Sequence, residues 1–205
     1  TSMARNKRGN RKSEYAMMEL QLLSVLAENA GKAYPTEELN RMWEMILTNQ
    51  FHDILPGSSI HEVYEQTKKE YAEIAETSAK LIGERLDALC AKKDESVTVW
   101  NTLGHRRNDI VELGANSAEA LTDGTNVYPV QQTKDGAVIY AENLPSKGYQ
   151  VLRPVSGAAV ETPFAVTEAG EGYTLETPFY TIKINANGEF TSLFDKENDR
   201  EVLQS

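Results

Sequence analysis

Cysteine is almost absent from this sequence, because Cys90 is the only one among 205 residues. A single thiol cannot build an internal disulfide framework, so the composition argues against a disulfide-stabilised secreted scaffold and favours a reducing, cytoplasmic location. Cys90 lies between Leu89 and Ala91 in a helical pattern. That setting indicates a small packing residue rather than a reactive nucleophile.

Long hydrophobic runs and an excess of positive charge are also missing. No stretch approaches 18 consecutive apolar residues, so we expect no membrane partner, and the N-terminal segment lacks the apolar run of a signal peptide. Lysine and arginine number 21 against 31 aspartates and glutamates, which gives a net charge of −10. Because nucleic-acid-binding surfaces are basic, this balance argues against a nucleic-acid partner.

What the sequence does contain changes character near residue 95. Residues 1–94 carry the helical period and predict a three-helix bundle. Residues 95–205 carry a period of two and predict an antiparallel β-sandwich that we expect to be incomplete. The predicted fold class is therefore α+β, with helices and strands segregated along the chain.

Three helices are predicted in the first half. The first runs from about 11 to 30 after a solvated basic arm over 1–12, and the second starts after Pro35 with Thr36 as a cap and ends at Pro56-Gly57. The third, about 33 residues long, opens on a capping box over 59–62 and ends near Lys92 and Lys93. The expected apolar faces are Tyr15, Met18, Leu22, Val25 and Leu26; Leu39, Met42, Trp43, Ile46 and Leu47; and Ile60, Val63, Tyr64, Tyr71, Ile74, Leu81, Ile82, Leu86 and Leu89.

Eight strands are predicted in the second half, with hairpin turns at Asp135-Gly136 and Asn187-Gly188. The expected strands are 96–100, 109–113, 127–131, 137–140, 148–153, 173–176, 179–185 and 189–195.

A histidine and an aspartate, His52 and Asp53, occur together at the expected end of the second helix. A histidine in the last turn of a helix can bind the free carbonyls, and its cation is favoured there. Asp53 does not fit this interpretation, because a carboxylate at that end is unfavourable. The alternative is half of a metal or sugar site, since imidazole binds zinc and a carboxylate can bind zinc or sugar hydroxyls. The residues alone leave both interpretations open.

The string from Asn49 to Ser59, NQFHDILPGSS, resembles the histidine–aspartate motif of the glycoside hydrolase family 38 α-mannosidases, and the bacterial members look nearest. The opening string TSMARNKRGNRKSE resembles another family segment that leads into the first bundle helix. Residues 99–103 and 188–203 are similar to the start and to a hairpin of the family's C-terminal β-domain, although Thr102 stands where proline is common. The resemblance covers the whole chain.

The resemblance implies a retaining, zinc-dependent hydrolase that acts on terminal α-linked mannose in oligosaccharides. It makes His52 a zinc ligand and Asp53 an acceptor of hydrogen bonds from mannose hydroxyls. The nucleophile and the acid/base would belong to an N-terminal catalytic domain preceding Thr1, so we expect no catalytic residue within this chain. The full enzyme would hold one zinc ion, whereas this fragment would bind zinc weakly or not at all and would be inactive.

Two other classes stay open. A β-sandwich with a helical stalk could bind carbohydrate without cleaving it, through exposed aromatics such as Tyr128, Tyr140, Tyr149 and Tyr173. Packing on half-buried strands is the more common role of such tyrosines. A structural protein could instead assemble through the apolar stripe of the long third helix. The chain could then form a homo-oligomer.

Overall fold

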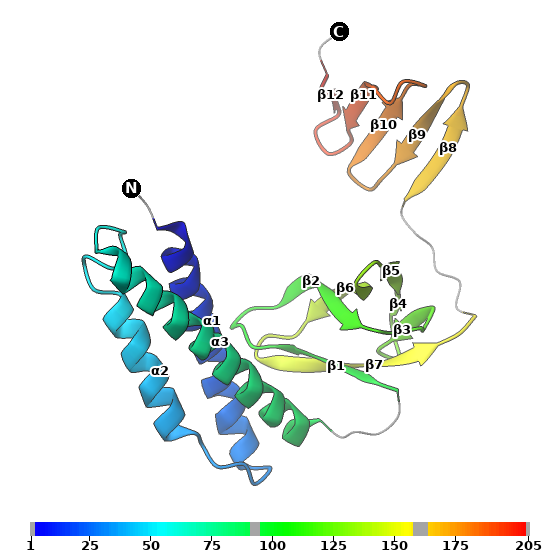
Figure 1. Ribbon diagram of the computed structural model, residues 1–205. Coiled ribbons are helices and arrows are strands. Elements are labelled where there is room, and N and C mark those ends of the chain that lie inside the picture. Colours follow the sequence, from blue (N-terminus) through cyan, green and yellow to red (C-terminus); the bar gives the residue numbers. More distant parts are fainter. Residues whose placement is uncertain (1–2, 91–94, 158–163, 204–205) are drawn as a thin grey trace.

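The computed structural model describes residues 3–90, 95–157 and 164–203. Three helices come first and twelve strands follow, and every strand pairing in the described ranges is antiparallel (Figure 1). The predicted α+β class, with helices followed by antiparallel sheets, is confirmed. Within the described residues, no helix is long and apolar enough to cross a membrane. The position of the boundary at 94/95 remains a prediction.

The bundle consists of α1 (Ala4–Glu28), α2 (Thr36–Asn49) and α3 (His61–Leu89). Its core combines apolar side chains from all three helices, since none of them can bury its own face alone. The α3 stripe is used within the chain, because Ile74 and Leu81 belong to this core, and assembly through that stripe loses its main support. The buried residues of the bundle core are Met17, Leu20, Leu39, Met42, Ile46, Ile74 and Leu81.

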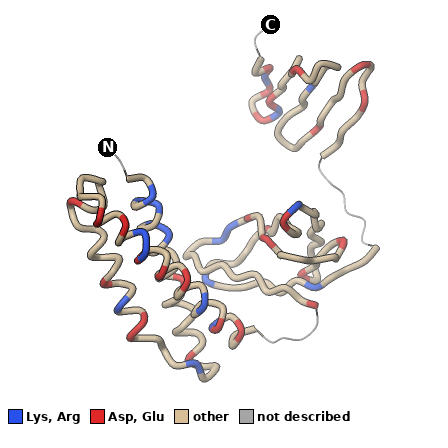
Figure 2. The backbone as a smooth tube through the Cα atoms, in the orientation of Figure 1, with Lys and Arg blue, Asp and Glu red and all other residues tan. Residues whose placement is uncertain are grey.

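The expected start and apolar face of the first helix are wrong. The helix begins at Ala4, so the segment predicted as a basic arm is helical, and its lysines and arginines lie on the first turns of α1 (Figure 2). The buried face carries Met17, Leu20 and Leu23, whereas Tyr15 and Met18 are exposed. The reason is that α1 has two apolar stripes, and the one aligned with buried asparagines and serines faces the other helices.

Both predicted helix caps are also wrong. The N-cap of α2 is Pro35 and that of α3 is Ile60, and neither makes a side-chain capping bond. The Ser59 amide donates instead to the Tyr64 hydroxyl at 2.8 Å. Ile60, expected on the inner face of the third helix, is exposed. Leu47, expected on the inner face of α2, is exposed as well. The predicted ends at Lys92 and Lys93 lie outside the described residues.

Residues 97–155 form two sheets that share one core. One sheet has the order β1-β7-β3-β4 and the other β2-β6-β5, and side chains such as Leu121 and Leu152 from the first meet Ile139 from the second. The strands are β1 (Val97–Asn101), β2 (Arg107–Gly114), β3 (Ala120–Thr122), β4 (Val127–Pro129), β5 (Gln131–Thr133), β6 (Gly136–Leu144) and β7 (Gly148–Val155). The predicted strand 127–131 is in fact two strands, and β3 was not predicted.

A third sheet follows, with the order β12-β11-β10-β9-β8. The predicted turn at Asn187-Gly188 lies between β10 and β11, and Gly188 has the positive φ of 82° that favours glycine. An apolar row crosses the sheet in register through Val166, Leu175, Ile182 and Leu193. The strands are β8 (Ala165–Ala169), β9 (Gly172–Glu176), β10 (Tyr180–Ile184), β11 (Phe190–Asp195) and β12 (Arg200–Glu201), of which β8 and β12 were not predicted.

Asp123 is expected to make the stability of the paired sheets depend on pH. Burial would raise the pKa of its carboxyl, but hydrogen bonds from the backbone of Asn126 and Thr125 and from the side chains of Asn126 and Tyr128 outweigh this and bring the pKa well below its ordinary value. Because the folded-state pKa is depressed, this contribution to stability is present above pH ~4 and is lost as the pH falls below it. We therefore expect Asp123→Asn to lower the free energy of unfolding at pH 6 and to matter progressively less towards pH 3. Denaturant titrations over that pH range test this; a deficit that stays constant with pH would contradict it.

Candidate functional site: an exposed histidine–aspartate turn

His52 and Asp53 lie in the turn over residues 50–57 that joins α2 to α3. The turn is at one end of the bundle, beside the N-terminal end of α1 (Figure 1). Hydrogen bonds from the amides of Ile54 and Leu55 to the Phe51 carbonyl, at 2.9 and 3.1 Å, shape it. Gly57 has a φ of 108°, and a Cβ there would lie 2.8 Å from the Met3 backbone nitrogen. The glycine therefore lets the chain pass close to α1 before α3 begins.

The two side chains face solvent and contact each other. The exposed fractions are 74% for His52 and 58% for Asp53, and Nε2 of His52 lies 3.4 Å from Oδ2 of Asp53. The His52 ring also lies against the Phe51 ring, with centroids 4.3 Å apart. An imidazole and a carboxylate held side by side at the surface can bind a cation or a group rich in hydroxyls.

The helix-end interpretation does not describe this geometry. The α-helix stops at Asn49 with Gln50 as its C-cap, so His52 lies beyond the helix. In the described residues, His52 makes no hydrogen bond to a carbonyl of the last turn of α2. The half-site interpretation remains a prediction, and the exposure of both side chains is compatible with it.

The described parts of the chain do not complete a zinc shell. No group of three or more histidine, cysteine, aspartate or glutamate side chains comes together there in a way that could hold a metal ion. His61 lies at the start of α3 and His105 lies in the β region, and both are exposed. A catalytic zinc site takes about three protein ligands, so His52 and Asp53 alone do not suffice.

Beneath the turn lies a set of polar residues that sequence reasoning did not single out. The Gln50 amide donates to Oδ1 of Asn10 at 3.0 Å and to Oε1 of Glu14 at 2.8 Å, and Asn49 donates to Glu70 at 2.8 Å. Burial, with the carboxylates of Glu70 and Glu14 nearby, raises the pKa of Tyr71 to about 12, so its phenol stays protonated. The available signal was the spacing of four between Asn6, Asn10 and Glu14, which places them on one helix face.

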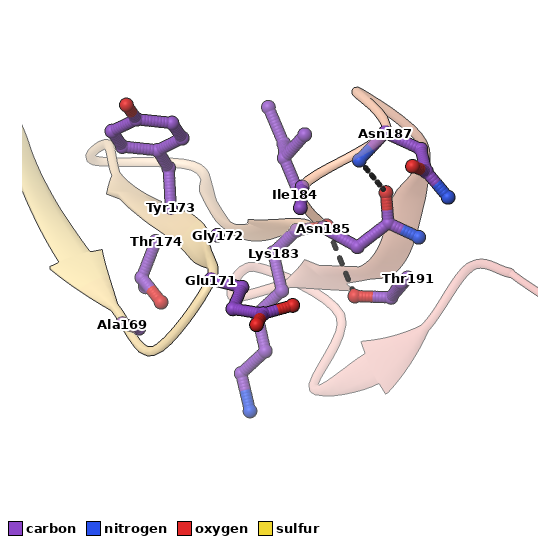
Figure 3. Close-up of a pocket in the computed structure, with 11 residues that line it drawn as sticks. Ala169, Glu171, Gly172, Tyr173, Thr174, Lys183, Ile184, Asn185, Asn187 and Thr191 are labelled. Atoms are coloured by element: carbon purple, nitrogen blue, oxygen red, sulfur yellow. Dashed lines mark hydrogen bonds between the residues drawn. The ribbon is translucent and has the colours of Figure 1, made fainter.

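The third sheet has a hollow of about 470 Å³ near the β8–β9 and β10–β11 turns. Its side chains do not converge: Tyr173 and Ile184 point to one side of the sheet, and Thr174 and Lys183 point to the other (Figure 3).

The tyrosines considered for carbohydrate binding are also dispersed. Tyr128 is buried, while Tyr140, Tyr149 and Tyr173 are exposed on three different sheets. In the described residues, neither the hollow nor these tyrosines provide one continuous aromatic surface on which a sugar could stack.

Comparison with known proteins identifies relatives of the chain. Residues 1–89 match the family model described as the alpha mannosidase middle domain. Human alpha-mannosidase 2C1 is 29% identical over 215 residues, covering 99% of this chain and 19% of that protein. Alpha-mannosidase G of Dictyostelium discoideum is 22% identical over 240 residues, covering 100% of this chain and 22% of that protein. The chain thus spans about a fifth of the length of these relatives.

The fold is shared with a solved structure of a protein in glycosyl hydrolase family 38 from Enterococcus faecalis. The TM-score is 0.67 at 15% identity, and the match covers 98% of this chain and 30% of that one. The family model, the curated relatives and the shared fold all point to the α-mannosidases. Residues 1–89 of this chain therefore resemble the α-mannosidase middle domain, the whole chain is similar to curated α-mannosidases, and its fold is shared with a glycosyl hydrolase family 38 protein.

Proposed function

We propose that the chain is part of a retaining, zinc-dependent α-mannosidase that hydrolyses terminal α-linked mannose in oligosaccharides. The observation that carries this proposal is the exposed His52–Asp53 pair, which lies at one end of a bundle that resembles the α-mannosidase middle domain. In the proposed roles, His52 contributes a nitrogen ligand to zinc and Asp53 accepts hydrogen bonds from mannose hydroxyls. The enzyme works in the cytoplasm, in keeping with the single free thiol of Cys90.

The rest of the active site comes from another part of the longer protein. Retaining hydrolysis needs two carboxyl groups about 5 Å apart, one as nucleophile and one as acid/base. Asp53 is the only carboxylate that the motif places beside His52, and it has the sugar-binding role. The nucleophile, the acid/base and the remaining zinc ligands therefore lie on a catalytic domain that covers the turn. When bound, zinc would hold the sugar and stabilise charge.

This division of the site predicts that the 205-residue chain is inactive and binds zinc weakly. One imidazole and one carboxylate lose the chelation that a full ligand shell provides, so calorimetric titration of the chain with zinc is expected to show a dissociation constant above about 1 μM, weaker than about −8 kcal/mol. A mannosidase assay of the longer protein, with the 205-residue chain beside it, completes the test. Tight one-to-one binding by the chain would contradict the division, and an inactive longer protein would contradict the proposed function.

A further inference from the structure

A ladder of polar residues on α1 underlies the His52–Asp53 turn. Asn6, Asn10 and Glu14 follow one another at every fourth position, and both asparagines are buried. These positions face the other helices, where an amphipathic helix normally carries apolar residues. A buried amide is costly unless it is hydrogen-bonded, so the bonds that these residues make account for their presence.

The ladder binds the turn on both sides of His52 and Asp53. Ahead of the pair, Gln50 uses both protons of its amide, one on Oδ1 of Asn10 at 3.0 Å and one on Oε1 of Glu14 at 2.8 Å. Behind the pair, Asn6 donates to the Ile54 carbonyl at 3.3 Å. The buried hydroxyl of Thr67 on α3 donates to Oδ1 of Asn6 at 2.9 Å, which orients that amide.

A second set of contacts completes the attachment at the surface. Lys7 donates to the Pro56 carbonyl at 3.2 Å, and the Tyr64 hydroxyl donates to the Asp53 carbonyl at 3.3 Å. The backbone of the turn is thus bonded to α1 and α3. Within the described residues of the bundle, no such bond reaches the side chains of His52 and Asp53, which remain exposed. The hydrogen bonds therefore hold the backbone of the turn, whereas the imidazole of His52 and the carboxylate of Asp53 extend into solvent.

We propose that Asn10, Glu14 and Gln50 are positioning residues, which hold the turn so that His52 and Asp53 reach the active site in a fixed geometry. The proposal rests on the proposed function, because positioning matters only if the pair acts there. Misplacement of an active-site group by about 1 Å can cost about 100-fold in rate. Residues that orient metal ligands typically contribute about 10- to 100-fold to metal affinity or activity.

Exchanging donor and acceptor tests this assignment. Gln50→Glu sets two carboxylates against each other and should release the turn. Gln50→Glu combined with Glu14→Gln restores the bond, because the new amide at position 14 donates to the new carboxylate and the Asn10 amide can turn over to donate as well. Glu14→Gln alone keeps an oxygen that accepts from Gln50 but gives up the charge of the acceptor, so its effect should be smaller than that of Gln50→Glu.

The first measurement uses the 205-residue chain without zinc. In Gln50→Glu, hydrogen exchange at the amides of Ile54 and Leu55 is expected to accelerate at least about tenfold, because hydrogen bonds to charged groups contribute about 1.5–3 kcal/mol. The double variant should return it towards wild type. Gln66→Met is the matched control, since it removes a 2.8 Å amide–carboxylate bond to Glu70 at an exposed place on α3. If Gln50→Glu leaves the exchange rates of the Ile54 and Leu55 amides unchanged, the proposal is wrong.

The second measurement uses the longer α-mannosidase. Gln50→Glu is expected to lower kcat about 10- to 100-fold, with recovery in the double variant and no loss in Gln66→Met. If His52→Ala inactivates the enzyme while Gln50→Glu leaves kcat unchanged, the positioning role is wrong and the proposed function stands. If His52→Ala leaves activity intact, the proposed function is wrong, and hydrogen exchange still decides whether the ladder orders the turn.

Discussion

If the proposed function holds, His52→Ala in the longer protein is expected to remove most of the bound zinc and to lower kcat/KM by more than about 100-fold. The reason is that a ligand binds the metal directly, so its loss should exceed the 10- to 100-fold that residues orienting a ligand contribute. His52 suits this role because its imidazole is exposed at the end of the bundle and is not engaged by the helix it follows. Metal analysis of the purified variant and steady-state kinetics measure both effects.

The neighbouring carboxylate should behave differently. Asp53→Asn keeps an oxygen acceptor but removes the charge that would bind mannose hydroxyls, so the zinc content should stay near wild type while turnover falls. A loss of about 100-fold is in the range found when one polar contact to a transition state is removed. His61→Ala is the control, because that histidine is exposed at the start of α3 and outside the turn. A His52→Ala enzyme with full zinc and normal turnover would contradict the proposed role.

The separation into helices and strands could be predicted because the two periods do not overlap in the sequence. Pro56 and Gly57 mark the break between α2 and α3, and Asn187-Gly188 marks a hairpin between β10 and β11. Some short strands could not be predicted because they contain too few residues to show an alternation of apolar and polar side chains. One example is β12, which has only two residues. The fold class follows from patterns within single elements, whereas the way that elements pack depends on partners distant in the sequence.

Only part of the candidate site could be predicted, for the same reason. The His52–Asp53 pair could be found from its motif, since the two residues are adjacent in the sequence. The support beneath it could not, because Asn10 and Gln50 are 40 residues apart and look like ordinary surface residues. Buried amides carry no hydrophobic signal, so only the packed structure shows that they join α1 to the turn.

Leu20→Ala is expected to destabilise the helical bundle by about 2–5 kcal/mol, the range for truncating a fully buried leucine. Leu20 has no exposed surface and belongs to the core with Ile46 and Ile74. Removing its side chain leaves a cavity that the packed neighbours can only partly close. Denaturant unfolding followed by far-ultraviolet circular dichroism, which is dominated by helix, measures the change in the free energy of unfolding.

Met18→Ala is the matched variant, and its effect should stay within about 0.5 kcal/mol. Met18 lies two residues away on the same helix with 60% of its surface exposed, and the period of the sequence had placed it on the inner face. The sequence pattern by itself would therefore rank the two substitutions in the opposite order. Equal losses would mean that the stripe of Met18 is covered in solution, and a dependence of Met18→Ala stability on protein concentration would then identify self-association as the cause. A small effect for Met18→Ala beside a large one for Leu20→Ala would establish that buried asparagines and serines, rather than the stripe with more large apolar residues, mark the side of α1 that faces the bundle.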